Sequence, residues 1–114
     1  MDKGKDMRDI QEEIKRDIQD NRVILFMKGV KNMPLCGFSA RVVDVLNHLN
    51  IPYETRDVLQ DDLLREGIKT YSNWPTLPQL YIQGKFIGGC DIVMQLQETG
   101  KLQELIADDA STST

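Results

Sequence analysis

The feature that most constrains the fold is an uninterrupted run of five apolar residues, Val23-Ile24-Leu25-Phe26-Met27. A run of this length without alternation is typical of a strand that is buried on both faces, as in a parallel sheet. Lys28-Gly29 ends the run. Apolar residues at helical spacing follow it, namely Val42, Val45, Leu46 and Leu49. The sequence therefore predicts a buried strand, a connecting loop and a helix that packs one face inward.

Cys36 lies where that helix is expected to begin. Unpaired backbone N–H groups and the positive end of the helix dipole favour a thiolate there. A free cysteine with a pKa of about 8.5 is only a few per cent ionised at pH 7, whereas such sites lower the pKa to roughly 3.5 to 7.5. The alternative is a buried cysteine that acts as a small apolar side chain. The neighbouring Gly37 and the strand-to-helix position favour an activated thiol, which can serve as nucleophile or metal ligand.

The length of 114 residues suits one domain, and no internal repeat divides it. We expect a single domain over residues 1–114, with an ordered core at about 7–107 and a polar tail at 108–114. The net charge of −4 is spread over interspersed acidic and basic residues, which disfavours nucleic-acid binding. No apolar run approaches the roughly 20 residues that cross a membrane, so we expect no membrane partner.

The chain has two cysteines and one histidine, too few for the four ligands of a structural zinc site. Any metal site must therefore borrow ligands. Two distant cysteines also do not resemble a disulfide-stapled secreted scaffold, which favours a reducing compartment. His48 lies about 18 Å from Cys36 along the same helix. We therefore expect a structural or surface role for His48 rather than that of a catalytic base.

The remaining pattern predicts alternating helices and strands. A helix over about residues 6–20 precedes the buried strand, and a second strand over 52–58 follows the Cys36 helix, which makes a right-handed βαβ unit. A further helix, a hairpin with a Gln83-Gly84 turn, another helix and a short terminal helix that starts after Gly100 complete the chain. The order α-β-α-β-α-β-β-α-α predicts an α/β fold with a four-stranded mixed sheet.

Several motifs follow this order at fixed places. They are Lys28-Gly29 eight positions before the thiol, Cys36-Gly37-Phe38-Ser39, Trp74-Pro75-Thr76-Leu77-Pro78 before the hairpin, and Gly88-Gly89-Cys90-Asp91 after it. Together they resemble the single-domain monothiol glutaredoxins, over roughly residues 7–107. The resemblance implies a thioredoxin fold of the glutaredoxin type, a four-stranded mixed sheet with helices on both faces.

The resemblance also implies a glutathione site. Lys28 and Arg65 would meet the glycyl carboxylate, and the cysteinyl backbone would pair with Leu77 before a cis Pro78. Backbone N–H groups of Cys90 and Asp91 would meet the glutamyl carboxylate, because a glycine turn lets a ligand approach a helix N-terminus. The Asp91 carboxylate would pair with the ammonium. Supporting positions are Gly37, Phe38, Ser39, Thr76, Pro78 and Gly89.

Each of these residues has a plainer interpretation. Lys28 and Arg65 could be solvated charges, and Asp91 a helix N-cap. Phe38 could lie in the core instead of covering the thiol or meeting a partner. Trp74 could be a packing residue under its loop, and Pro78 could have the trans bond that sequence alone favours. Cys90 could be a packed side chain or one half of a disulfide with Cys36.

Ser39 cannot form a disulfide, so the mechanism of Cys-x-x-Cys reductases is closed to this motif. The resemblance implies two functions for Cys36. In the favoured one, a homodimer holds a [2Fe-2S] cluster with Cys36 of each subunit and two glutathiones, which completes four sulfur ligands, and passes it to acceptor apoproteins. The alternative is a glutathione-dependent oxidoreductase that removes glutathione from proteins. The resemblance associates the long Gly29 to Leu35 segment with weak reductase activity.

The resemblance further implies a monomer in the apo form and a BolA-type protein as a possible partner. The expected location is the bacterial cytoplasm, or an organelle matrix if a transit peptide has been removed.

Overall fold

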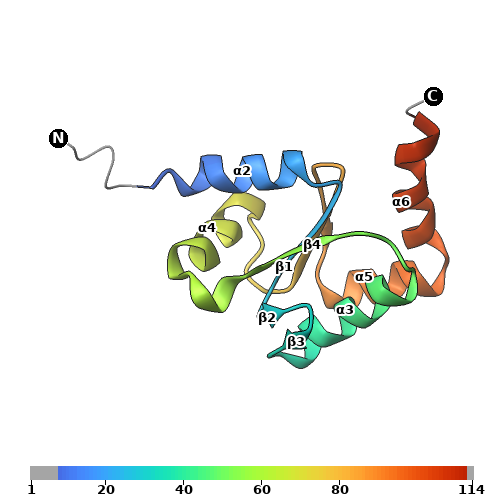
Figure 1. Cartoon of the computed structure of the whole chain (residues 1–114), viewed down its shortest axis with the longest axis horizontal. Coiled ribbons are helices and arrows are strands. Elements are labelled where there is room, and N and C mark those ends of the chain that lie inside the picture. Colours follow the sequence, from blue (N-terminus) through green and yellow to red (C-terminus); the bar gives the residue numbers. More distant parts are fainter. Residues whose placement is uncertain (1–7, 113–114) are drawn as a thin grey trace.

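The computed structural model describes the backbone of residues 8–112 and the side chains of residues 8–107. In chain order, its elements are α2 (Ile10–Asp20), β1 (Val23–Met27), β2 (Gly29–Val30), β3 (Met33–Pro34), α3 (Gly37–His48), β4 (Glu54–Asp57), the 3-10 turn η1 (Val58–Gln60), α4 (Asp62–Ser72), β5 (Gln79–Ile82), β6 (Lys85–Gly88), α5 (Cys90–Glu98) and α6 (Lys101–Thr112). Figure 1 shows their arrangement.

The main sheet has four strands in the order β4-β1-β5-β6. Strand β1 runs parallel to β4 and antiparallel to β5, and β5 and β6 form an antiparallel hairpin. Gln83 and Gly84 make its turn with φ values of 53° and 80°, as a two-residue hairpin turn with positive φ at both positions requires. The mixed sheet and the βαβ unit that α3 closes are both as expected.

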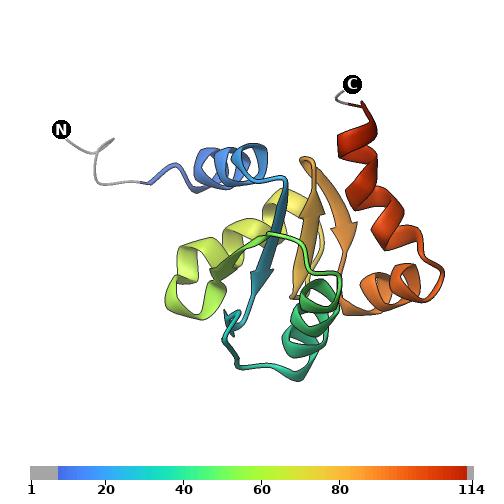
Figure 2. The same cartoon turned by 45° about the vertical axis from the view of Figure 1, so that its right-hand side comes forward.

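Strand β1 lies at the centre and is buried on both faces. Val23, Leu25 and Met27 belong to a core cluster with α3, α5 and α6, and Ile24 and Phe26 belong to a second cluster with α2 and α4. Figure 2 shows the sheet between these two groups of helices. Because neighbouring strand residues point to opposite faces, a strand covered on both sides must be apolar throughout.

The bounds of three elements differ from those expected. Helix α2 begins at Ile10, where the Asp9 carboxylate accepts the N–H of Glu12 at 3.2 Å as an N-cap. The expected start at residue 6 lies outside the described residues, and Arg8 precedes the helix. Strand β4 is shorter than 52–58, because the Asp57 side chain accepts the N–H of Leu59 and starts η1.

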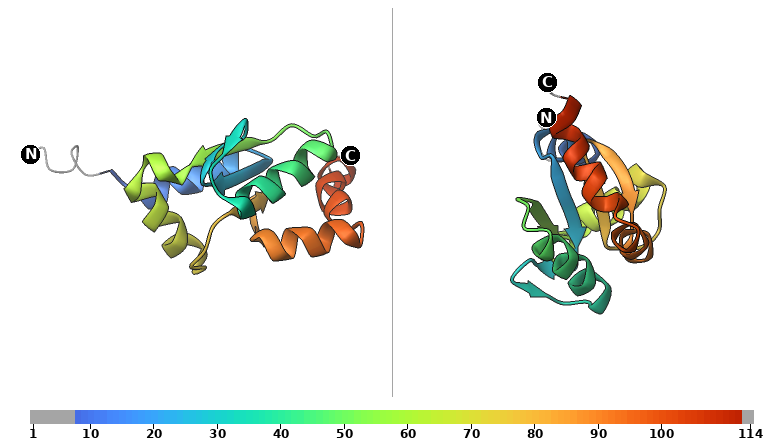
Figure 3. Two further views of the ribbon diagram at one scale, coloured as in Figure 1. Left: turned by 90° about the horizontal axis from the view of Figure 1, so that it is seen from below. Right: turned by 90° about the vertical axis from the view of Figure 1, so that its right-hand side faces the viewer.

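The last helix also extends further than expected. Leu102 and Ile106 of α6 are buried against the core, and the helical backbone continues to Thr112, beyond residue 107 where we expected a polar tail to begin. Figure 3 shows α6 leaving the body of the domain at an angle to α5. No helix in the described part of the chain is long and apolar enough to span a membrane.

Candidate functional site

Cys36 is the N-cap residue of α3. Its carbonyl accepts the N–H of Ala40 at 2.9 Å, which starts the helix, and its own backbone is extended with φ −146° and ψ 135°. Its thiol is free and partly exposed. The expected position of Cys36 at a helix N-terminus is therefore confirmed.

The pKa of the Cys36 thiol lies below its ordinary value. The largest cause is the backbone N–H of Ser39, and the N–H of Phe38, the charge of Lys28 and the Ser39 hydroxyl act in the same direction. Partial burial opposes them. These groups stabilise a thiolate, which is the reactive and metal-binding form of cysteine.

Ser39 connects this thiol to the end of β1. Its side chain is fully buried, and its Oγ accepts the backbone N–H of Lys28 at 3.1 Å. Since a hydroxyl oxygen that accepts one bond still has its own proton to donate, Ser39 can serve Lys28 and the Cys36 sulfur together. Lys28 and the first turn of α3 are thereby held at fixed positions around the thiol.

The segment between Lys28 and Cys36, expected as a loop, contains the short hairpin β2–β3. Gly29 has a φ of 94°, and a Cβ there would lie 2.6 Å from both the Leu35 nitrogen and the Met33 oxygen. The Asp57 carboxylate accepts the Gly29 N–H at 2.9 Å. Sequence reasoning missed this hairpin, because its strands are too short to show a pattern.

A second anchor holds the turn of the same hairpin. The Lys31 ammonium donates to the carbonyl oxygen of Tyr53 at 2.5 Å and lies 4.1 Å from the centroid of the Tyr53 ring. The Tyr53 hydroxyl in turn donates to Asn47 of α3 at 2.7 Å. The hairpin is therefore fixed to both α3 and the segment that leads into β4.

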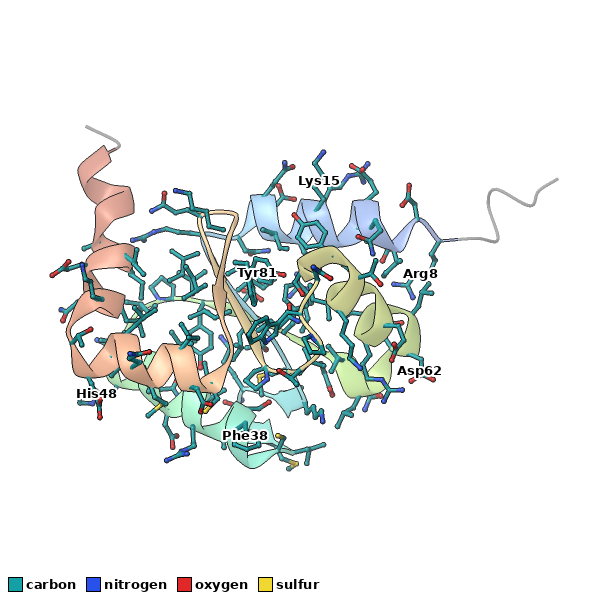
Figure 4. The ribbon with its side chains drawn as sticks, turned by 180° about the vertical axis from the view of Figure 1, so that it is seen from behind. Arg8, Lys15, Phe38, His48, Asp62 and Tyr81 are labelled. Atoms are coloured by element: carbon teal, nitrogen blue, oxygen red, sulfur yellow. The ribbon has the colours of Figure 1, made fainter. Side chains whose placement is uncertain are left out.

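Large apolar side chains stand exposed on the β2–β3 hairpin, next to Cys36 in the chain and on the first turn of α3. We call Val30, Met33, Leu35 and Phe38 the apolar rim; their exposed fractions are 48%, 65%, 59% and 57%. Figure 4 shows Phe38 at the surface at the start of α3 and His48 at the far end of that helix. The interpretation of Phe38 as a core residue is therefore wrong, while the exposed His48 agrees with a surface role.

A cleft of about 250 Å³ opens beside the start of α3. It brings together six residues that were singled out from the sequence: Phe38, Thr76, Leu77, Gly89, Cys90 and Asp91. Trp74 and Ile92 also line it, and sequence reasoning did not place Ile92 there. The residues come from α3, from the segment before β5 and from the start of α5.

The segment before β5 forms one wall of this cleft. The Leu77–Pro78 peptide bond is cis, as the resemblance implied. Trp74 packs on Phe86 with 5.9 Å between ring centroids, and the indole still lines the cleft. Trp74 is therefore both a packing residue and part of the site.

The start of α5 forms the opposite wall. Gly89 is the N-cap residue, and no side chain among the described residues caps this end. A Cβ on Gly88 would lie 2.7 Å from the Ile92 Cβ, and one on Gly89 would lie 3.2 Å from the Pro78 oxygen. The two glycines thus permit close packing against Ile92 and the Pro78 carbonyl, while the expected approach of a ligand to this helix end stays a prediction. The interpretation of Asp91 as the N-cap is wrong, because Asp91 is exposed within the first turn.

Cys90 differs from Cys36 in its surroundings. Only 7% of it is exposed, and it packs in the core cluster with α3. Burial is the largest cause of a raised pKa; the charges of Asp91 and Cys36 add to it, and Arg41 opposes it. Cys90 is therefore a packed thiol whose backbone borders the cleft, in agreement with the packing interpretation. The structure contains both cysteines as free thiols.

Lys28 and Arg65 lie outside the set of residues that line the cleft. Lys28 acts on Cys36 through its charge. Arg65, at the start of α4, lies 3.4 Å from Asp62 and 3.6 Å from Glu66, both of them well exposed. Arg65 therefore pairs within its own helix. In the described part of the chain, no group of three or more His, Cys, Asp or Glu side chains could hold a metal ion.

Comparisons with known proteins show the family of the chain. The family model described as Glutaredoxin matches residues 23–87. The chain is 58% identical over 86 residues to an uncharacterized monothiol glutaredoxin of Synechocystis, covering 75% of this chain and 80% of that protein. It is 48% identical over 109 residues to a probable monothiol glutaredoxin 2 of Rickettsia typhi, covering 96% and 95%. It is also 48% identical to the chloroplastic Monothiol glutaredoxin-S14 of Arabidopsis thaliana, covering 83% of this chain and 55% of that protein.

Solved structures give the same result. Reduced apo GrxS14 from poplar superposes with a TM-score of 0.77 at 46% identity, covering 87% of this chain and 91% of that one. A buckwheat glutaredoxin in complex with glutathione superposes with a TM-score of 0.78 at 26% identity, covering 87% and 88%. With a matched family model over most of the chain and monothiol relatives at high identity, this chain belongs to the glutaredoxin family, as a monothiol member.

Proposed function

We propose that this protein carries a [2Fe-2S] cluster, held by Cys36 of two copies of the chain and by the thiolates of two glutathiones, and transfers it to acceptor apoproteins. The observation that carries the proposal is the contrast between the two cysteines: Cys36 is accessible with a lowered pKa, and Cys90 is buried with a raised one. One chain thus offers one suitable sulfur. A [2Fe-2S] cluster takes four, so the remaining three must come from other molecules.

Glutathione is the proposed source of the second sulfur of each subunit. Its glutamyl carboxylate would accept the N–H groups of Cys90 and Asp91 at the start of α5, where the helix dipole favours an anion. The Asp91 carboxylate would pair with the adjacent ammonium, and the backbone of Leu77 with the cysteinyl unit. The cleft between these residues supports this placement, and the glutathione complex of the buckwheat relative supports the ligand.

The glycyl carboxylate would extend toward Lys28 and Arg65. Lys28 already acts on Cys36 through its charge, which supports a position next to a thiol-bearing ligand. Arg65 would leave Asp62 and Glu66 to bind the ligand. Those ion pairs are exposed and long, so each contributes at most about 1 kcal/mol and does not prevent the exchange.

The second copy is proposed to cover the apolar rim around the thiol. Each subunit would supply one Cys36, and the cluster would lie between them, so that the apo protein is a monomer and the loaded protein a homodimer. Glutathione dissociates without unfolding the chain, so a cluster held partly by glutathione is easier to hand over than one held by four protein cysteines.

Acceptor proteins are the expected partners of the loaded form, and a BolA-type protein is a further proposed partner. The relatives include bacterial and chloroplastic proteins. The proposed location is therefore the bacterial cytoplasm or an organelle matrix.

A glutathione-dependent oxidoreductase is the second candidate, and the lowered pKa of Cys36 favours it. The Cys36 thiolate would attack the glutathione sulfur of a mixed disulfide and release the protein thiolate. A second glutathione thiolate would then attack the Cys36–glutathione disulfide, release oxidised glutathione and restore the Cys36 thiolate. The exposed side chains of the β2–β3 hairpin beside the thiol would hinder a large substrate, so we rank this activity second.

Anaerobic reconstitution with iron and sulfide tests the carrier directly. The wild-type protein with glutathione should give a coloured dimer by absorbance and size-exclusion chromatography, and omission of glutathione should prevent it. Cys36→Ser should remain colourless, whereas Cys90→Ala should retain most of the colour because its backbone is kept. A coloured Cys36→Ser protein would contradict the ligand assignment. Fast, Cys36-dependent removal of glutathione from a protein substrate would reverse the ranking of the two functions.

A further inference from the structure

Gln79 is a fully buried polar side chain beneath the wall of the cleft. It is the first residue of β5, where its register partner on the central strand is Phe26. A carboxamide at such a position must satisfy its donors and acceptor within the protein, because burial of an unpaired polar group is costly. Its hydrogen bonds therefore show what the side chain does.

The carboxamide nitrogen of Gln79 bonds to the segment that lines the cleft. Nε2 donates to the carbonyl oxygen of Trp74 at 3.2 Å and to that of Thr76 at 3.2 Å. An amide nitrogen has two protons, so these two bonds use its whole donor capacity. One side chain thereby fixes two carbonyl groups on both sides of Pro75.

The carboxamide oxygen has its own partner. Tyr81 Oη donates to Gln79 Oε1 at 3.1 Å. Burial raises the pKa of Tyr81, so its hydroxyl keeps the proton that it donates. If the carboxamide were reversed, its oxygen would face two carbonyl oxygens, which can only accept hydrogen bonds. The two carbonyls therefore select the orientation of the carboxamide, and the Tyr81 hydroxyl satisfies its buried oxygen.

Tyr81 is itself held firmly. It is buried among aromatic rings, with centroid distances of 5.7 Å to Phe26 and 5.4 Å to Phe86. Figure 4 shows Tyr81 in the interior of the domain. The series Tyr81, Gln79 and the Trp74–Thr76 carbonyls thus connects the rigid sheet to the edge of the cleft.

The segment from Pro75 to Pro78 depends on this connection. Among the backbone hydrogen bonds of turns, loops and caps in the described chain, none involves residues 75–78. The opposite side of the segment faces Gly89, where a Cβ would lie 3.2 Å from the Pro78 oxygen. Since Thr76 and Leu77 line the cleft, their position sets its width.

We propose that Gln79 is a positioning residue of the glutathione site: its buried carboxamide, anchored to the sheet by the Tyr81 hydroxyl, holds the Trp74 and Thr76 carbonyls so that the Leu77 backbone is preformed for the cysteinyl unit of glutathione. The role rests on the glutathione site proposed above. Gln79 does not touch the ligand, and it acts through the segment that does. Preformation raises affinity because the segment then loses less freedom when it binds.

Two variants remove the connection at different points. Gln79→Met keeps a side chain of similar length without hydrogen bonds, and it should raise the Kd for reduced glutathione about tenfold, since two carbonyls lose their partner. Tyr81→Phe keeps the carboxamide and removes only the hydrogen bond to its oxygen, and it should raise the Kd about threefold. Titration calorimetry with reduced glutathione measures both values.

A matched control separates positioning from loss of stability. Ile18→Val shortens a fully buried side chain in the same core cluster as Tyr81, on helix α2, which does not line the cleft, and should change the Kd by less than about twofold. The pH profile of Cys36 alkylation should stay the same in Gln79→Met, since Gln79 makes no bond to the thiol or to α3. A Gln79→Met protein that binds glutathione as the wild type does, or whose affinity and alkylation profile change together, would overturn the proposal.

Backbone order parameters from 15N relaxation distinguish the two levels of the proposal. In Gln79→Met, the N–H groups of Thr76 and Leu77 should have lower order parameters than in the wild type, with or without glutathione. If the wild-type protein bound no glutathione, the proposed function would fail, while lower order parameters at Thr76 and Leu77 would still support the positioning role. Unchanged order parameters at these two residues would overturn the positioning role in either case. If Gln79→Met fails to fold, Tyr81→Phe decides by the same two measurements.

Discussion

The starts of α3 and α5 form a natural comparison, because each carries a cysteine and a neighbouring glycine and neither has a side-chain cap in the described structure. Yet the pKa of Cys36 is lowered and that of Cys90 is raised. Cys36 is the N-cap itself, so its sulfur can receive the first N–H groups of α3. Cys90 is the first residue inside α5, and its side chain turns into the core. In this protein, the helix N-terminus therefore lowers the pKa of the cysteine at the N-cap position and not that of the cysteine packed in the core.

The two ends also differ in what remains available to a ligand. At α3 the N–H groups of Phe38 and Ser39 stabilise the chain's own sulfur. At α5 the Cys90 side chain packs in the core and does not cover the helix end, and the cleft opens beside that end. In the proposed function, the first end supplies the reactive atom, and the second would supply an anion site for glutathione, which brings its own sulfur.

The largest expected difference between the two ends is in alkylation. At pH 7 iodoacetamide should modify Cys36 at least about a hundredfold faster than Cys90, because the reaction follows the thiolate fraction and access. The pH at which the alkylation rate reaches half its maximum should lie below the ordinary cysteine pKa for Cys36 and above it for Cys90. Mass spectrometry of the two cysteine peptides after timed labelling measures both rates. Equal rates would remove the basis of the comparison.

The second largest effect concerns the glycines. Gly88→Ala should lower the free energy of unfolding by about 2 to 3 kcal/mol, because its φ of 149° and the 2.7 Å approach to Ile92 exclude a Cβ. Gly37→Ala at the other helix has no atom within 4 Å of its Cβ and should be neutral or slightly stabilising. Urea unfolding of both variants measures the contrast. A Gly88→Ala protein as stable as Gly37→Ala would show that the start of α5 can shift freely.

A smaller effect concerns the charge at α5. Asp91→Ala should weaken glutathione binding about fivefold, since a partly exposed ion pair contributes about 1 kcal/mol. Asp44→Ala removes the same charge from an exposed position on α3 and should leave the affinity within about twofold. Calorimetric titration of both variants compares them. Equal losses would mean that net charge, and not the pairing with the ammonium, controls affinity.

Much of this fold could be predicted from local pattern. The apolar run of β1, the Gln83-Gly84 turn and the helical stripe of α3 each carry a signal that neighbours in sequence create. The β2–β3 hairpin could not, because distant residues hold it: Asp57 through the Gly29 N–H, and Tyr53 through Lys31. Helix bounds were also wrong, since α2 starts at a cap and α6 continues to Thr112.

The candidate site also contains residues that local sequence patterns reveal and residues that they do not. Cys36 and the glycines before α5 were recognisable because their chemistry is local to the motif. Gln79 was not, since a glutamine at the start of a strand gives no sign that its carboxamide bonds to residues earlier in the chain. The exposure of Phe38 could not be predicted either, because its spacing in the sequence left a core position open.

The smallest expected effect is the pH dependence of stability. The pKa of Cys36 is lower in the folded protein, so its contribution to stability is present above the unfolded cysteine value of about 8.5 and is lost as the pH falls through the folded value. The pKa of Cys90 is higher in the folded protein, so its contribution is present below about 8.5 and is lost as the pH rises through the folded value.

Between pH 6 and 10, the stability of Cys36→Ser relative to the wild type should therefore fall as the pH rises, and that of Cys90→Ser should increase. Urea unfolding at several pH values measures both slopes. Slopes of the same sign would contradict the opposite electrostatic surroundings of the two thiols.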